Sequence, residues 1–130
     1  IMGFEVMIQM GNSAAFLSAG GYHHHIGLHT WESANGTKPP EGSTGLYHFA
    51  ILVPTRKELA KVFKRLEKNK WPIEGASDHG VSEAIYIKDP DKNGIEIYSD
   101  RKKDKWQHDH EGNLIMYTRP LDIDNLLQEL

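Results

Sequence analysis

Residues 46–72 read LYHFAILVPTRKELAKVFKRLEKNKWP, and this stretch decides the fold of the chain. Its near-continuous apolar run, residues 46–53, is typical of a buried strand, and Pro54 ends the run. Thr55 and Glu58 then have the spacing of a capping box, in which two side chains satisfy free backbone amides at a helix start. The stretch therefore predicts a buried strand followed directly by a helix.

Apolar residues continue at helical spacing beyond this cap: Leu59, Val62, Phe63 and Leu66. Basic side chains lie mostly off the apolar stripe, as in a helix that packs one face against a sheet. Trp71-Pro72 cannot continue a helix, because a proline disfavours the helical conformation of the residue before it. We therefore predict a helix over about residues 56–69.

The second half of the chain continues with strands. Residues 73–82 are glycine-rich and polar, AIYIK at 84–88 predicts a strand, and IEIYS at 95–99 predicts the return strand. The DPDKNG sequence at 89–94 between them is a strong turn signal. We expect two or three strands after the helix, so this half is expected to form a β-α-β-β-β unit. A short helix is predicted from Ile123 to the end.

The first half repeats part of this plan. Alternating or short apolar segments predict strands over residues 4–10, 14–18 and 23–31, arranged as an antiparallel meander. Segments 14–28 and 84–98 have the same length and the same strand–turn–strand plan. We therefore expect an α+β fold with paired β-α-β-β-β modules that form a curved, cup-like mixed sheet, the first module lacking its opening strand and helix.

The chain of 130 residues has the length of one domain. We divide it into a partial first module over 1–31, a polar connecting loop over 32–45, a complete second module over 46–100, and a tail with a short helix over 101–130. Because the chain opens at Ile1 and enters a strand almost at once, we expect a missing N-terminal piece of the first module.

Composition narrows the function classes. The formal charge of −3 gives no support for a nucleic-acid or anionic-membrane partner. The absence of cysteine excludes a disulfide scaffold, a thiolate zinc site and a cysteine nucleophile. No apolar run has the length of a membrane span or the form of a signal peptide, so we expect a cytoplasmic protein. The count of 8 histidines is unusually high for a chain of 130 residues.

His48 and Glu96 each interrupt an apolar strand of the second module. An imidazole and a carboxylate are costly to bury unpaired, and together they are two of the three ligands of a 2-His-1-carboxylate Fe(II) site. On spacing alone, two polar positions on a solvated strand face are the simpler interpretation.

A longer sequence pattern favours the interpretation of His48 and Glu96 as metal ligands. Residues 78–96 read DHGVSEAIYIKDPDKNGIE and carry a histidine, an apolar-Tyr pair, an acidic-Pro pair, a glycine-containing turn and a glutamate: His79, Ile85-Tyr86, Asp89-Pro90, Gly94 and Glu96. With LYHFAIL and HHHIGL upstream, this order resembles the metal module of extradiol ring-cleaving dioxygenases of the catechol 2,3-type. These belong to the vicinal oxygen chelate superfamily, with glyoxalases and bleomycin-resistance proteins. Lys92 departs from the family, which usually has Gly or Pro there.

The resemblance implies a role for each matching residue. His48 and Glu96 match two metal ligands, Tyr86 matches the phenol that hydrogen-bonds the bound catecholate, and His79 matches a second-sphere histidine. The remaining histidine ligand of the family lies on the opening strand of the first module. Since this chain lacks that strand, we expect an incomplete metal site, no activity as a monomer, and an exposed sheet edge that pairs with another copy.

His25 matches the family's acid–base histidine, with His24 as the alternative because a one-residue slip swaps strand faces. Strand alternation would place His23, His25 and His29 on one face and His24 on the other.

The resemblance implies an Fe(II)-dependent extradiol dioxygenase, a truncated copy, that acts on a small catechol-like diol with dioxygen. We expect a homo-oligomer with no nucleic-acid or membrane partner. The first alternative is a glyoxalase-type isomerase or lyase that uses Mn(II), Ni(II) or Zn(II), but the matching strand position near Ile26 offers no carboxylate. The second is a non-catalytic module that binds a small molecule such as an antibiotic, which would need none of the site residues above.

Overall fold

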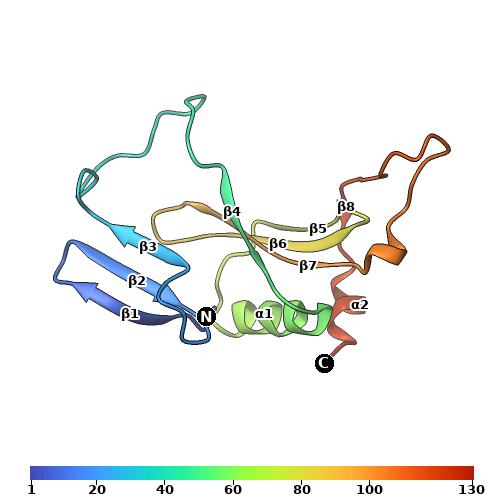
Figure 1. Ribbon diagram of the computed structural model, residues 1–130, viewed down its shortest axis with the longest axis horizontal. Coiled ribbons are helices and arrows are strands. Elements are labelled where there is room, and N and C mark those ends of the chain that lie inside the picture. Colours follow the sequence, from blue (N-terminus) through green and yellow to red (C-terminus); the bar gives the residue numbers. More distant parts are fainter. The chain divides into compact units, whose positions relative to one another are not determined.

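The computed structural model describes residues 1–130 and divides into two compact units (Figure 1). Residues 2–45 form one unit, and residues 46–130 with Ile1 form the other. The first unit is a three-stranded antiparallel sheet in chain order: β1 (Glu5–Met10), β2 (Ala14–Ser18) and β3 (Ile26–His29). The predicted meander is confirmed, and this unit contains no helix.

The third strand is shorter than the predicted segment 23–31, because β3 begins only at Ile26. Gly20 and Gly21 both adopt positive φ angles, and the turn they open extends to His25. Strand pairing with β2 starts at Ile26, opposite Leu17. The expected alternation of faces is therefore wrong for His23–His25, which precede the strand.

The second unit contains a five-stranded mixed sheet. Its elements are β4 (His48–Leu52), α1 (Arg56–Lys68), β5 (Gly75–Asp78), β6 (Ser82–Lys88), β7 (Gly94–Asp100), the 3₁₀ turn η1 (Lys103–Lys105), β8 (Arg119–Pro120) and α2 (Ile123–Leu127). The strand order is β4-β7-β6-β5-β8, with β4 parallel to β7 and the other pairs antiparallel. The predicted β-α-β-β-β order and the α+β class are confirmed.

Helix α1 forms as the sequence predicts. The Thr55 hydroxyl accepts a hydrogen bond from the Glu58 backbone N–H at 3.2 Å, and Asn69 is the C-cap. The apolar stripe of the helix, including Leu59 and Leu66, is fully buried. Neither α1 nor α2 has the length and apolar character that a membrane span requires.

The core of the second unit lies between α1 and one face of the sheet, since α1 packs against β6 and β7. Ile85 and Ile97 are paired across these strands and fully buried. Their chain neighbours Tyr86 and Glu96 point to the opposite face, because side chains alternate along a strand. Helix packing on one face thus leaves the other face free for a site.

Strand β4 is an edge strand, which corrects the expectation of a buried one. Tyr47 is 89% exposed, and Leu46 and Leu52 are exposed as well. The reason is the sheet order, which gives β4 a neighbour on one side only. Its apolar residues 49 and 51 alternate toward the covered face, opposite residues 95 and 97 of β7.

Strands β5 and β8 have no clear signal in the sequence. Segment 75–78 reads GASD and lacks the branched and aromatic residues that strands favour. It becomes a strand because β6 pairs with it on one side and β8 on the other. Beyond β8, the Asp122 carboxylate caps α2 by accepting from the Asn125 backbone N–H at 2.9 Å.

One buried carboxylate joins the helices to the sheet. Glu83 is 5% exposed and accepts from Arg56 Nε at 2.6 Å and from Arg101 Nη2 at 2.8 Å. Burial is the largest single influence and works to lower the pKa of both guanidinium groups, but the hydrogen bonds and charges of their acidic partners, Glu83 first among them, together raise the pKa. Arg56 also binds Glu129 at 3.0 Å, which ties the C-terminal segment to α1.

Candidate metal and substrate site

His48 and Glu96 meet on the open face of the second unit. His48 Nε2 lies 3.0 Å from Glu96 Oε2, with side-chain exposures of 31% and 16%. The two residues lie on the neighbouring parallel strands β4 and β7, where Ala50 is the direct partner of Glu96. His48 precedes Ala50 by two positions, so its side chain shares the face of the carboxylate.

Gly94 makes this approach possible. It is paired directly with His48, and a Cβ at this position would collide with the Tyr47 carbonyl oxygen and lie 2.9 Å from His48 Cβ. Any larger residue would push β4 away from β7. The sequence indicates Gly94 only as part of a turn, although its place two residues before Glu96 was a signal for this closer role.

Tyr86 extends the pair to a third strand. It is the direct partner of Glu96 across β6 and β7, and its hydroxyl donates to Glu96 Oε1 at 3.2 Å. Burial, followed by the charge and hydrogen bond of Glu96, raises the pKa of Tyr86 to about 12. The phenol therefore keeps its proton at neutral pH and remains a hydrogen-bond donor.

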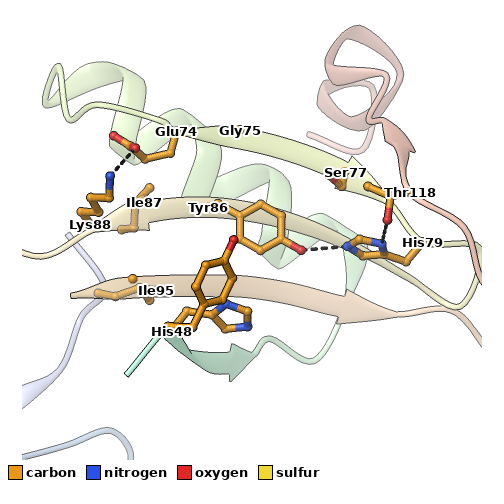
Figure 2. Close-up of a pocket in the computed structure, with 12 residues that line it drawn as sticks. His48, Glu74, Gly75, Ser77, His79, Tyr86, Ile87, Lys88, Ile95 and Thr118 are labelled. Carbon is orange, nitrogen blue, oxygen red and sulfur yellow. Dashed lines mark hydrogen bonds and ion pairs between the residues drawn. The ribbon is translucent and has the colours of Figure 1, made fainter. Parts of the chain in front are cut away.

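His79 completes a row of four polar side chains. It follows β5, and its Nε2 lies 2.8 Å from the Tyr86 hydroxyl (Figure 2). The imidazole on β4, the carboxylate on β7, the phenol on β6 and the second imidazole after β5 thus follow one another across the sheet. The structure brings together all four residues that the sequence analysis selected in this half of the chain.

A cavity of about 540 Å³ opens along this row. Its lining includes Tyr47, His48, His79, Tyr86 and Thr118 (Figure 2). An ion pair between Glu74 and Lys88, with 2.7 Å between carboxylate and ammonium, lies on its wall. A cavity of this size accommodates a small organic ligand.

The donor pair fits a divalent metal ion. Two adjacent ligands of a six-coordinate ion, each about 2.1 Å from the metal at right angles, lie about 3 Å apart, and His48 Nε2 and Glu96 Oε2 show this separation. Imidazole nitrogen and carboxylate oxygen are donors that Fe(II) accepts. Neither unit contains a group of three or more His, Cys, Asp or Glu side chains placed to hold one ion. The site therefore fits a metal with two protein donors.

The candidate acid–base histidine lies in the first unit. The Ala19 backbone N–H donates to His25 Nδ1 at 3.3 Å, and the Ser18 hydroxyl lies 3.0 Å from the same nitrogen. Since Nδ1 accepts, neutral His25 carries its proton on Nε2. His24 instead packs edge-on against Phe16, with ring centroids 4.9 Å apart. That either histidine serves the site of the second unit stays a prediction.

Known proteins resemble this chain in both sequence and fold. The family model described as "Glyoxalase/Bleomycin resistance protein/Dioxygenase superfamily" matches residues 2–97. Catechol-2,3-dioxygenase of Bacillus subtilis (strain 168) is 45% identical over 130 residues, which cover 99% of this chain and 44% of that protein. Biphenyl-2,3-diol 1,2-dioxygenase 2 of Rhodococcus globerulus is 26% identical over 94 residues, 72% of this chain and 49% of that protein. The chain thus spans less than half the length of these relatives.

Solved structures agree with the fold. A lactoylglutathione lyase from Agrobacterium tumefaciens matches with a TM-score of 0.56 and 23% identity, covering 75% of this chain and 76% of that one. A glyoxalase/bleomycin resistance protein/dioxygenase from Alicyclobacillus acidocaldarius matches with a TM-score of 0.58 and 14% identity, covering 80% and 78%. At these identities the likeness concerns the fold alone. Together with the family match, it confirms the resemblance found in the sequence: the chain belongs to the glyoxalase/bleomycin resistance protein/dioxygenase superfamily.

Proposed function

We propose that this chain provides the metal-binding and substrate-binding unit of an extradiol ring-cleaving dioxygenase that acts on a catechol-like diol. The observation that carries the proposal is the continuous row His48–Glu96–Tyr86–His79 on the open face of the sheet. The name of the relative that is 45% identical over the chain supports the same reaction class.

His48 Nε2 and Glu96 Oε2 are the atoms that would hold Fe(II). When bound, Fe(II) supplies a centre that binds a diol and dioxygen together, because a site with few protein ligands leaves positions open for both. The pair provides two protein donors. We expect the remaining positions to be filled by water, an ion or a residue from a neighbouring chain.

Tyr86 and His79 handle protons beside the diol. The raised pKa of Tyr86 keeps a hydrogen on its oxygen, so the phenol donates to a negatively charged oxygen in the cavity. His79 Nε2 lies within hydrogen-bond distance of that phenol and exchanges a proton with it. The two residues therefore orient the diol and supply protons without holding the metal.

His25 is proposed as the acid–base histidine. With Ala19 donating to its Nδ1, the neutral ring offers an N–H at Nε2, which suits the proton-donating half of this role. Its partner Ser18 is fully buried, so the ring orientation is set inside the first unit.

Metal analysis separates this proposal from the two alternatives. The full-length protein is incubated without oxygen with Fe(II), Mn(II), Ni(II) or Zn(II), and retained metal is measured after gel filtration. Oxygen uptake with catechol is then followed for each form. Retained iron with catechol-dependent uptake supports the dioxygenase, another metal without uptake supports an isomerase or lyase, and no metal supports a binding module.

Matched variants locate the metal. His48→Ala and Glu96→Ala should each abolish retention, whereas His110→Ala should not, because the His110 side chain is 91% exposed and belongs to no strand. Unchanged retention in both site variants would contradict the proposed ligands.

A further inference from the structure

The segment Tyr117–Arg119 lies beside the pocket although it falls outside the residues that the family model matches. Arg119 pairs with Asp78 of β5, and the Tyr117 backbone N–H donates to the His79 carbonyl at 3.3 Å. A little further on, the buried Leu121 donates its N–H to Ala76 at 3.2 Å. The C-terminal segment thus extends the sheet next to the residue that carries the second imidazole of the row.

Both ring nitrogens of His79 have partners. Nδ1 lies 3.0 Å from the Tyr117 carbonyl oxygen and 3.3 Å from the Thr118 hydroxyl, and Nε2 lies 2.8 Å from the Tyr86 hydroxyl (Figure 2). A carbonyl oxygen only accepts, so Nδ1 must carry a hydrogen to bind it. A flipped ring would place carbon atoms against all three partners.

The hydrogen on Nδ1 decides what Nε2 does. In the neutral ring Nε2 then presents a lone pair, and the single proton of Tyr86, which the structure directs at Glu96, must turn to His79 instead. In the charged ring Nε2 carries a hydrogen and donates to the phenol oxygen, which leaves the Tyr86 proton for Glu96 at 3.2 Å. In both states Nε2, the His79 nitrogen that gains or loses a proton, faces Tyr86.

Two contacts hold the segment in place. The Tyr117 ring covers Gly80, where a Cβ would lie 2.8 Å from Tyr117 Cε1, and Gly80 has a φ of +81°. On the ring, Arg119 places its guanidinium carbon 4.1 Å from the centroid. Gly80 and Arg119 therefore fix the position of the Tyr117 ring and, with it, of the adjoining Tyr117 carbonyl.

We infer that the Tyr117 carbonyl and the Thr118 hydroxyl are positioning groups that hold His79 as the Nδ1–H tautomer and keep its Nε2 directed at Tyr86. The catalytic consequence of this arrangement rests on the proposed function, whereas the tautomer itself does not.

Nuclear magnetic resonance of the metal-free 130-residue chain tests the tautomer directly. The histidines are labelled with ¹⁵N, and long-range ¹H–¹⁵N correlations assign which nitrogen of each neutral ring carries the hydrogen. The His79 signals are identified by their loss in His79→Gln. We expect a pyrrole-type Nδ1 and a pyridine-type Nε2.

Variants test the two contacts. Gly80→Ala displaces the Tyr117 ring with its adjoining carbonyl and should populate the Nε2–H tautomer. Thr118→Val removes only the hydroxyl, keeps the shape of the side chain and leaves the carbonyl in place, so it should populate the Nε2–H tautomer to a smaller extent. Thr118→Ser should retain the native tautomer. Ser77→Ala, which alters the same pocket without touching His79, is the matched control.

An Nε2–H tautomer in the unmodified chain would overturn the inference, as would an unchanged tautomer in both Thr118→Val and Gly80→Ala. In a form that cleaves catechol, Thr118→Val should lower kcat about tenfold with little change in KM, and Thr118→Ser should restore it. If no form cleaves catechol, the proposed function fails, while the tautomer result stands on its own.

Discussion

Tyr86 and Glu96 are direct partners across β6 and β7, and the phenol donates to the carboxylate at 3.2 Å. This contact links the His48–Glu96 pair, the proposed metal donors, to the Tyr86–His79 pair. The carboxylate also meets His48, and the phenol also meets His79. The pair is therefore the junction between the proposed metal-holding half of the row and its proton-handling half.

The first prediction concerns Tyr86 itself. In the metal-free chain its phenol should ionise near pH 12, above its ordinary value of 10.0. Because the folded chain holds this proton more tightly than the unfolded chain, the group stabilises the fold fully below pH 10 and loses that contribution as pH rises to about 12.

Ultraviolet titration of tyrosinate, with Tyr86→Phe to identify the signal, measures this pKa. Glu96→Gln should lower it, because the negative charge that opposes phenolate formation is gone while burial remains. A Tyr86 pKa that rises or stays constant in Glu96→Gln would show that the carboxylate does not act on the phenol.

Gly94→Ala should separate β4 from β7. The new Cβ would meet the Tyr47 carbonyl, which is backbone and cannot rotate away. We expect a loss of about 2 kcal/mol in the free energy of unfolding and weaker metal retention, measured by urea denaturation and metal analysis. Gly75→Ala is the control, since a Cβ there has open space; equal losses in both variants would contradict the special role of Gly94.

Glu83→Gln should destabilise the second unit by about 2 kcal/mol, because two guanidinium groups lose a charged partner that is almost fully buried. Thermal and urea unfolding measure the change. Glu67→Gln, which removes an exposed ion pair with Lys64, should stay within about 0.5 kcal/mol of the parent chain. A small effect at Glu83 would mean that water replaces the carboxylate at both arginines.

His25→Asn and His79→Gln should lower turnover far more than metal content. Neither imidazole is proposed as a ligand, so the metal should remain bound in both variants while proton transfer fails. Metal analysis beside oxygen uptake on the same samples separates the two effects. Loss of iron in parallel with activity would move the affected histidine into the ligand set.

The predictable parts of the fold are those whose signals are local. The cap at Thr55, the apolar stripe of α1 and the turn between β6 and β7 each arise from residues within a few positions of one another, and all three formed as expected. By contrast, β5 and β8 form because distant strands satisfy their backbone groups. Their own residues carry no strand preference.

The site divides in the same way. The order of residue types from His79 to Glu96 pointed to these side chains through its resemblance to known dioxygenases, and strand pairing places Tyr86 and Glu96 on one face. The sequence could not predict that Gly94 admits His48, since this depends on how closely β4 approaches β7.

By itself the sequence determined the α+β plan, because strand and helix signals follow from short-range spacing. The superfamily and the four polar residues of the row came from the sequence through its resemblance to known dioxygenases, since spacing alone favoured solvated polar positions. Only the tertiary structure decided that β4 lies at an exposed edge and that the Tyr117 carbonyl reaches His79 across 38 positions of chain. The physical reason is that strand order and long-range hydrogen bonds depend on which distant backbone groups are free to pair, and no local pattern records that.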